Sequence, residues 1–206
     1  MRLHVASRNA GKIEEMHRLL DAHVAGVEIV GLDDVAPYDE PVEDGATFAD
    51  NALLKARAGY AATGLPSIAD DSGLCVDALN GMPGVLSARW SGPPKSDARN
   101  NELLLAQLAD VPDERRGARF RCVVAYVDGP GDDDVLLVEG VMPGRVIRET
   151  RGSGGFGYDV VFVPAAAEPH TSAELASAAK DAISHRGRAL REIAPQVARR
   201  LAGGGR

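Results

Sequence analysis

The sequence has few of the residues that mark the specialised classes of protein. Only Cys75 and Cys122 are cysteine among its 206 residues, and they lie far apart, so we expect neither a disulfide framework nor a cysteine-based zinc site. No apolar run approaches the roughly 20 residues that a membrane-spanning helix needs. The apolar stretch at the N-terminus is too short for a signal peptide. We therefore expect a protein with reduced thiols that resides in the cytoplasm and has no membrane partner.

Basic residues are outnumbered, and lysine in particular is scarce. Lysine and arginine total 23 against 30 for aspartate and glutamate, which gives a formal net charge of -7. A protein that binds duplex DNA or RNA needs a basic face for the phosphates, so we expect no nucleic-acid polymer as a partner. The only lysines are Lys12, Lys55, Lys95 and Lys180. With 45% hydrophobic and 26% charged residues, the composition is otherwise that of an ordinary globular protein.

Hydrophobic periodicity along the chain predicts an α/β fold with a mixed sheet. The opening alternates strand, loop, helix and strand, the unit that builds parallel sheets, whereas residues 119–141 indicate a hairpin whose first strand is half-buried. Residues 33–46 hold two prolines and six acidic residues and predict a loop. The length suits one domain over residues 1–206, or two lobes that share a core. Strands are expected over residues 3–6, 27–32, 67–69, 119–127, 135–141, 144–148 and 160–163, helices over 13–20, 47–63, 96–108, from 171 onward and over 190–201, and a frayed end over 203–206.

The first candidate site is the motif Ser7-x-Asn9-x-x-Lys12, between the first strand and the first helix. Main-chain N–H groups at a helix N-terminus attract anions, and a lysine there adds a point charge. The serine and asparagine side chains supply further donors, but the spacing is not that of a P-loop. The motif therefore permits two interpretations, a phosphate site or an ordinary turn capped by asparagine.

The second candidate is Asp70-Asp71-Ser72-Gly73, directly after the short strand expected over residues 67–69. Ligands of α/β proteins usually bind at the carboxyl ends of strands, where these polar residues are expected. Adjacent carboxylates point to opposite sides, so one can hold Mg²⁺ or activate water while the other orients the main chain. The alternative is a plain Asp-Ser-Gly turn. Glu43 in the acidic loop is a second candidate oxygen ligand, unless it is simply solvated.

Two later motifs carry glycine and positive charge. Residues 152–157 match the Gly-x-Gly-x-x-Gly spacing of dinucleotide-binding proteins, but they come late and lead into a strand, which counts against a dinucleotide-dependent oxidoreductase. A glycine-rich loop flanked by Phe156 and Tyr158 suits a planar ligand. Residues 180–187 group a lysine, a histidine and an arginine in an acidic chain. Cations near a helix C-terminus also simply complement the helix dipole, so this group by itself permits both interpretations.

In their order along the chain, these motifs resemble one family, the inosine triphosphate pyrophosphatases, and in it the bacterial enzymes that act on dITP and XTP. The resemblance covers residues 3–190, and the set of blocks is specific although each block alone is weak. The blocks are Ser7-x-Asn9-x-x-Lys12-x-x-Glu15, Thr47-Phe48-x-x-Asn51-Ala52-x-x-Lys55-Ala56, Ala69-Asp70-Asp71-Ser72-Gly73-Leu74, Pro83-Gly84-Val85-x-Ser87-Ala88-Arg89, Gly154-Gly155-Phe156-Gly157-Tyr158-Asp159 and Ile183-Ser184-His185-Arg186-Gly187.

The resemblance implies an elongated α/β fold in which two lobes flank a mixed sheet, with a central active-site cleft and a homodimer as the assembly. It implies Mg²⁺-dependent cleavage of ITP, dITP or XTP between the α and β phosphates, which removes non-standard purine nucleotides. Asp71 is then the general base and, with Glu43, a metal ligand, whereas Asp70 is left as a ligand, an orienting group or a turn residue. The substrate-binding residues that the resemblance implies are Ser7, Arg8, Asn9, Ala10, Gly11, Lys12 and Lys55 for the phosphates, Ser72 beside the substrate, and Phe156, Gly157, Tyr158, Asp159, Lys180, His185 and Arg186 for the base.

The chemistry of such a substrate agrees with these residue types. A triphosphate carries roughly four negative charges, which Mg²⁺, Lys12 and Lys55 would offset. Hypoxanthine and xanthine present a carbonyl at position 6 where adenine has an amino group, so donors such as main-chain N–H groups, His185 or Arg186 select against adenine. The alternative hypothesis is a non-catalytic module that binds and senses purine triphosphates through the same loops.

Overall fold

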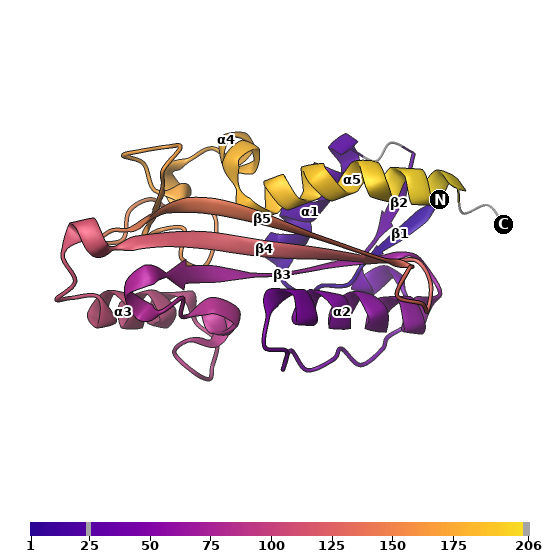
Figure 1. Ribbon diagram of the computed structural model, residues 1–206, viewed down its shortest axis with the longest axis horizontal. Coiled ribbons are helices and arrows are strands. Elements are labelled where there is room, and N and C mark those ends of the chain that lie inside the picture. Colours follow the sequence, from indigo (N-terminus) through magenta and orange to yellow (C-terminus); the bar gives the residue numbers. More distant parts are fainter. Residues whose placement is uncertain (24–25, 204–206) are drawn as a thin grey trace. The chain divides into compact units, whose positions relative to one another are not determined.

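The computed structural model describes residues 1–23 and 26–203, which form a six-stranded sheet flanked by helices (Figure 1). The strand order is β2-β1-β3-β4-β5-β6. Strand β1 pairs in parallel with β2 and β3, and β5 pairs antiparallel with β6, which confirms the predicted α/β class with a mixed sheet. The strands are β1 (Arg2–Val5), β2 (Glu28–Val30), β3 (Ser67–Val76), β4 (Gly117–Val127), β5 (Val135–Val146) and β6 (Phe162–Pro164). The helices are α1 (Ala10–His23), α2 (Phe48–Thr63), α3 (Asp97–Gln107), α4 (Ser177–Ile183) and α5 (His185–Gly203).

The chain divides into two compact units. Unit 1 comprises Met1–Asp71, Cys122–Gly140 and Arg186–Arg206, and unit 2 comprises Ser72–Arg121 and Val141–His185. The divisions fall within β3, β4 and β5 and near the junction of α4 with α5. The expectation of a single elongated domain over residues 1–206 stays a prediction.

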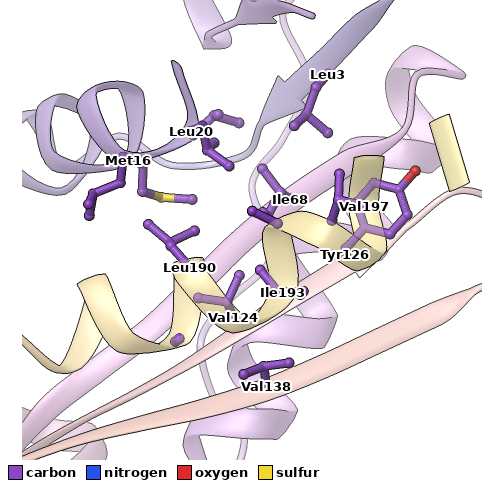
Figure 2. Close-up of a cluster of buried hydrophobic side chains, with 14 of the residues drawn as sticks. Leu3, Met16, Leu20, Ile68, Val124, Tyr126, Val138, Leu190, Ile193 and Val197 are labelled. Atoms are coloured by element: carbon purple, nitrogen blue, oxygen red, sulfur yellow. The ribbon is translucent and has the colours of Figure 1, made fainter. Parts of the chain in front are cut away.

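Unit 1 packs helices on both faces of its strands. Helices α1 and α5 lie on one face and α2 lies on the other (Figure 1). Helical spacing places Leu190, Ile193 and Val197 of α5 on one side of that helix, where they pack in the same core as Met16 and Leu20 of α1 (Figure 2). This confirms the helix predicted over residues 190–201, which begins earlier, at His185. The strand residues of this core are Leu3, Val5, Ile68, Cys122, Val124, Tyr126 and Val138.

Strand β4 is buried more completely than its sequence predicts. Cys122 and Val124 belong to the core beneath α1 and α5, and the intervening Val123 and the following Ala125 are buried as well. The predicted half-buried strand is therefore wrong for the part of β4 in unit 1. Helices on both faces leave this stretch no solvent-facing side, so its pattern is a continuous apolar run.

Local signals set the ends of α2 as predicted. The Thr47 hydroxyl accepts the N–H of Asp50 at 3.1 Å, and the Asp50 carboxylate accepts the N–H of Thr47 at 2.9 Å, so an aspartate completes the capping box. Gly64 ends the helix in the left-handed conformation at φ +67°. Helix α2 approaches β1 closely at Gly59, where a Cβ would lie 2.9 Å from the His4 ring.

Unit 2 has its own apolar core beneath α3. The Ser96 hydroxyl caps this helix by accepting the N–H of Arg99 at 3.3 Å, as predicted. The rings of Phe120 and Phe162 meet edge to face with their centroids 4.8 Å apart. The buried residues of this core are Leu74, Val76, Leu104, Leu108, Ala118, Phe120, Met142, Val146, Tyr158, Val161 and Phe162.

The predicted break after residue 69 is wrong, because β3 continues to Val76. Residues 70–73 therefore form neither a turn nor the end of a strand. Gly73 is required there by packing, since a Cβ would lie 2.3 Å from the carbonyl oxygen of Gly84 and 2.4 Å from the Ser87 hydroxyl. A glycine inside a strand often marks such a close approach of another segment.

Other boundaries also differ from the predictions. The strand expected over residues 144–148 is the end of β5, and the strand expected over 160–163 is the shorter β6. Thr171 and Glu174 do form a capping box, but it encloses one turn of 3₁₀-helix rather than a full helix. Gly203 is the last residue of α5, and the rest of the predicted frayed end lies outside the described residues. Within residues 1–23 and 26–203, no helix combines the length and apolarity that crossing a bilayer requires.

Candidate active site

The motif Ser7-x-Asn9-x-x-Lys12 forms the turn from β1 into α1 and is capped by asparagine, whereas its interpretation as a phosphate site stays a prediction. The Asn9 side chain accepts the main-chain N–H of Lys12 at 3.1 Å, which is the capping contact. The Lys12 ammonium lies 3.3 Å from a carboxylate oxygen of Asp70 and 4.0 Å from one of Asp71. The turn therefore also brings a cation to the acidic residues of β3.

The other predicted residues of this turn lie in different surroundings. Ser7 is buried, and its hydroxyl accepts the N–H of Asn9 at 3.4 Å. Ala10 and Gly11 begin α1. Arg8 is exposed and pairs with Glu40 of the acidic loop, and its expected contact with the phosphates stays a prediction.

Asp70 and Asp71 lie in the middle of β3, and their side chains contact different groups because side chains alternate along a strand. One Asp70 oxygen accepts from Arg186 at 3.1 Å and 3.3 Å. One Asp71 oxygen accepts from the Asn51 amide at 3.0 Å. The two carboxylates therefore have different hydrogen-bond partners, whereas the charges of Lys12 and Lys55 act on both.

Lys55 joins the acidic loop to β3. Its ammonium donates to Glu43 at 2.6 Å and to the main-chain oxygen of Asp70 at 2.7 Å, so the structure brings together a predicted phosphate-binding residue and a predicted metal ligand. Burial by itself lowers the pKa of Lys55, but the carboxylates around it, Asp70 and Glu43 among them, outweigh burial and raise the pKa. Asn51 lies one turn earlier on the same face of α2 and accepts the N–H of Gly45 at 2.8 Å. The sequence prediction missed Asn51, although its spacing of four residues from Lys55 was the available signal.

The pKa of Asp70 lies far below its usual range. Burial opposes this shift, but Lys12, Arg186 and Lys55 together outweigh burial, and the Arg186 hydrogen bonds add to their effect. Asp70 is completely buried and remains ionised. Of the three roles left open for it, a turn residue is wrong, and its contacts make it the counter-ion of the surrounding cations.

The pKa of Asp71 moves in the opposite direction, above its usual range. Burial is the largest cause, and the charge of Glu43 adds to it. Lys12, Lys55 and the hydrogen bond from Asn51 lower the pKa without cancelling the effect of burial. Adjacent carboxylates whose environments separate their pKa values in this way are typical of sites with distinct acid–base roles.

Arg186 is buried between two carboxylates in unit 1. It is 1% exposed and pairs with Glu15 of α1 as well as with Asp70. Its expected contact with a purine base stays a prediction, and the structure gives its guanidinium a second role as the partner of these carboxylates. Glu15 was not among the predicted site residues, because nothing in the local sequence shows that its partner comes from α5.

The oxygen ligands around Asp71 fit a divalent cation that is shared with a substrate. Glu43 and Asp71 influence each other electrostatically, and repulsion between two carboxylates is what a bound cation relieves. Among the residues that the structure describes, no group of three or more His, Cys, Asp or Glu side chains is placed to hold a metal by itself. Mg²⁺ is usually held by one or two carboxylates together with water and substrate phosphates, so two protein carboxylates match its requirements.

The glycine-rich loop of unit 2 is organised around Asp159. One oxygen of this carboxylate accepts the Lys180 ammonium at 2.7 Å and the N–H of Phe156 at 2.9 Å. The Lys180 ammonium also lies 5.0 Å from the centre of the Phe156 ring, a cation–π contact. Three of the predicted base-binding residues are therefore in mutual contact. The loop leads into β6 and not into a helix, so its glycine spacing is not a dinucleotide fingerprint.

The remaining predicted residues of unit 2 are also placed by specific contacts. His185 stacks on Phe120, with ring centroids 4.9 Å apart and ring planes 12° from parallel. Tyr158 is buried, and its hydroxyl donates to the main-chain oxygen of Ser87 at 2.9 Å. Ser72 is half-buried in β3, at the start of unit 2.

Comparison with known proteins shows the family to which the chain belongs. The model of the Ham1 family matches residues 3–196. A protein of Nocardia farcinica named dITP/XTP pyrophosphatase is 64% identical over 198 residues, which cover 96% of this chain and 95% of the relative. A crystal structure described as a nucleoside-triphosphatase or dITP/XTP pyrophosphatase from Mycobacterium abscessus is 54% identical with a TM-score of 0.75, covering 94% of this chain and 98% of the other. A HAM1 protein from Coxiella burnetii is 38% identical with a TM-score of 0.86, covering 96% and 98%. The resemblance deduced from the six sequence blocks is thereby confirmed, and the chain belongs to the Ham1 family.

Proposed function

We propose that this chain hydrolyses ITP, dITP and XTP between the α and β phosphates and releases the nucleoside monophosphate and pyrophosphate. The observation that carries the proposal is the cluster in unit 1, where the ammonium groups of Lys12 and Lys55 lie 2.6–4.0 Å from the carboxylates of Glu43, Asp70 and Asp71. The names of these relatives, at 54–64% identity over nearly the whole chain, support dITP and XTP as substrates. The reaction removes non-standard purine nucleotides from the precursor pool.

Lys12 and Lys55 bind the triphosphate in this proposal. Lys12 projects from the first turn of α1, whose main-chain N–H groups favour an anion, and Ser7 and Asn9 line the same turn. Both lysines are held by carboxylates before the substrate arrives, so they need little reorganisation to meet a polyanion.

Asp71 orients the attacking water and accepts its proton. The hydrogen bond from Asn51 fixes one oxygen of the carboxylate, and this positions the carboxylate as a general base requires. Glu43 and Asp71 hold the metal ion, which we propose is Mg²⁺. When bound, Mg²⁺ offsets phosphate charge and lowers the pKa of a coordinated water.

The purine binds to the glycine-rich loop of unit 2 in this proposal. The Phe156 ring offers an apolar face, and Lys180 and His185 offer donors that match the carbonyl at position 6 of hypoxanthine or xanthine. Adenine presents an amino group at that position, and a donor that faces donors is left unpaired, which costs about 1–3 kcal/mol for each buried group. Arg186 is the further predicted donor. The enzyme works in this proposal as a cytoplasmic homodimer, and the free thiols of both cysteines are consistent with a reducing compartment.

A substrate panel with detection of released pyrophosphate tests the function. With Mg²⁺ present, we expect turnover of ITP, dITP and XTP and far less turnover of ATP and GTP. Asp71→Asn should lower kcat by about 10³-fold, because it removes the base while keeping the size of the side chain. Asp110→Asn is the matched control, because Asp110 is exposed and belongs neither to the cluster in unit 1 nor to the glycine-rich loop of unit 2. This variant should keep normal activity.

The outcomes separate the two functional hypotheses. Tight binding of ITP without pyrophosphate release, in folded protein and with several divalent cations tried, would instead support a non-catalytic module that senses purine nucleotides. Normal turnover by Asp71→Asn would remove Asp71 as the base and leave the substrate assignment intact.

A further inference from the structure

Helix α3 holds one residue of the glycine-rich loop at two points. The Asp97 carboxylate accepts the main-chain N–H of Gly157 at 2.7 Å. The Asn101 amide donates to the main-chain oxygen of the same residue at 2.9 Å. Residues four apart on a helix share one face, so the first turn of α3 presents an acceptor and a donor to the two main-chain polar groups of a single residue.

This two-point contact is rigid on the helix side. Asn101 is 4% exposed, and its amide nitrogen also donates to the main-chain oxygen of Asp97 at 2.8 Å, which restricts the orientation of the side chain. Asp97 is the first residue of α3, directly after the Ser96 cap. The N-terminal turn of α3 is thereby a fixed support for whatever it contacts.

On the loop side, Gly157 is held by hydrogen bonds at both its N–H and its carbonyl. This residue is half-buried and adopts the left-handed conformation at φ +62°, and a Cβ there would meet no atom within 4 Å beyond the adjacent residues. Since glycine has no side chain to pack against the protein, the contacts from Asp97 and Asn101 constrain its orientation. The preceding N–H, that of Phe156, is accepted by Asp159. Carboxylates therefore hold two successive peptide N–H groups of the loop.

We propose that Asp97 and Asn101 are positioning residues for recognition of the purine base, an inference that rests on the proposed function. By fixing Gly157 they set the orientation of Phe156 on one side and of Tyr158 on the other. They also hold the N–H and the carbonyl of Gly157 within the protein, so selection between purines falls to side chains such as Lys180. Neither residue touches substrate or the reacting atoms in this proposal.

Asn100, next to Asn101 on the same helix, supplies a matched control. It is equally buried at 2% exposure, and its amide contacts the main chain of Ser91 at 2.8 Å and of Ser87 at 3.3 Å. The carbonyl of Ser87 also accepts the Tyr158 hydroxyl, so the control is a stringent one. Asn100→Ala removes the same chemical group from the same helix but leaves both contacts to Gly157 in place.

The test compares KM and kcat for ITP, the preference for ITP over GTP, and inhibition by inorganic tripolyphosphate, which has no base. In Asn101→Ala and in Asp97→Ala, we expect the KM for ITP to rise about fivefold to tenfold, because each variant loses one hydrogen bond that orders the loop. The preference over GTP should fall, whereas kcat and the inhibition constant of tripolyphosphate should stay within about twofold. Asp97→Asn keeps an acceptor oxygen for the Gly157 N–H and should restore the wild-type KM.

Two results would overturn the proposal. One is a change in KM and in purine preference no larger in Asn101→Ala than in Asn100→Ala. The other is an equal loss of tripolyphosphate inhibition and of ITP affinity, which would show a general structural role. Asp97 is exposed, so its variants should fold even if removal of the buried Asn101 amide is not tolerated. Failure of the wild-type protein to cleave any nucleoside triphosphate would refute the proposed function instead.

Discussion

Charge holds the cluster around Asp71 in unit 1, whereas hydrogen bonds to the main chain hold the glycine-rich loop of unit 2. The unit 1 cluster joins the cations Lys12, Lys55 and Arg186 to the carboxylates Glu15, Glu43, Asp70 and Asp71. In unit 2, Asp97 and Asp159 accept main-chain N–H groups, and Lys180 is the cation that pairs with Asp159.

This difference corresponds to what each region is proposed to bind. A triphosphate is recognised by charge, and a buried network of fixed charges is already arranged to meet it. A purine is recognised by its flat faces and by the direction of its hydrogen bonds, which calls for a loop whose peptide groups are held still. Perturbations of charge should therefore act mainly on unit 1, and perturbations of hydrogen-bond geometry mainly on unit 2.

The largest effect that would test this comparison is expected from Arg186→Met. The substitution leaves the buried carboxylates of Glu15 and Asp70 without their guanidinium, and removal of one partner of a buried ion pair costs about 3–5 kcal/mol. Urea unfolding followed by circular dichroism measures the loss. Arg18→Met is the matched control, because Arg18 pairs with Glu14 at 3.1 Å on the exposed side of α1, where such pairs contribute at most about 1 kcal/mol.

Equal losses for the two arginine variants would contradict a unit 1 held by buried charge. The double variant Glu15→Gln with Arg186→Met sharpens the result. It removes the charge of Glu15, one of the two carboxylates that Arg186→Met leaves without their guanidinium. The double variant should therefore recover part of the stability that Arg186→Met loses.

The second effect concerns the shape of the cation. Lys55 is 7% exposed and donates at 2.6 Å and 2.7 Å to two oxygens, and the wider, planar guanidinium of arginine does not fit between them. Lys55→Arg and Lys12→Arg should each lower kcat/KM for ITP by roughly tenfold to a hundredfold, since small displacements in a preorganised site are costly. Lys95→Arg changes an exposed lysine and should leave kcat/KM unchanged.

Steady-state kinetics with ITP for the three lysine variants decides this point. If Lys55→Arg is as active as Lys95→Arg, then net positive charge is sufficient and a compact ammonium is not required. In that case the scarcity of lysine in the sequence would carry no information about the site.

The elements that the sequence predicts well are those with local signals. Helices α2 and α3 begin directly after Thr47 and Ser96, because these side-chain caps satisfy N–H groups within the same few residues. The extent of β3 could not be predicted, because Asp70 and Asp71 look like a loop until their partners are known. Only cations from other segments allow these carboxylates to lie inside a buried strand.

The residues of the candidate site also divide into those with a signal in the sequence and those without one. Sequence motifs indicated Lys12, Glu43, Lys55 and Asp71, and the structure brings these four together in unit 1. Glu15 was missed because its partner is 171 residues away. Asp97 and Asn101 of unit 2 were missed because they contact the main chain of Gly157, which no pattern of side chains reveals.

The smallest effect is expected at a contact of unit 1 that involves no charged group. Besides its ion pairs through Glu40 and Glu43, the acidic loop makes a neutral contact, since the His4 ring meets the Tyr38 hydroxyl at 2.9 Å and the main-chain oxygen of Val30 at 3.1 Å. Burial lowers the pKa of His4 below its ordinary value of 6.5, and the hydrogen bond to Val30 only partly opposes this.

A histidine with a lowered pKa makes the folded state sensitive to acid. Between its folded pKa and 6.5 the unfolded chain binds more protons than the folded one, so the stability that neutral His4 contributes is present above 6.5 and is lost as the pH falls. Between about pH 7.5 and about pH 5.5, the wild-type melting temperature should fall by a few degrees more than that of His4→Gln, which cannot gain a proton. His170→Gln replaces an exposed histidine and should behave as the wild type. An identical pH dependence in His4→Gln and the wild type would mean that His4 tolerates a proton. The contact of the acidic loop with His4 would then not require a neutral ring, and this exception to the contrast between the two units would disappear.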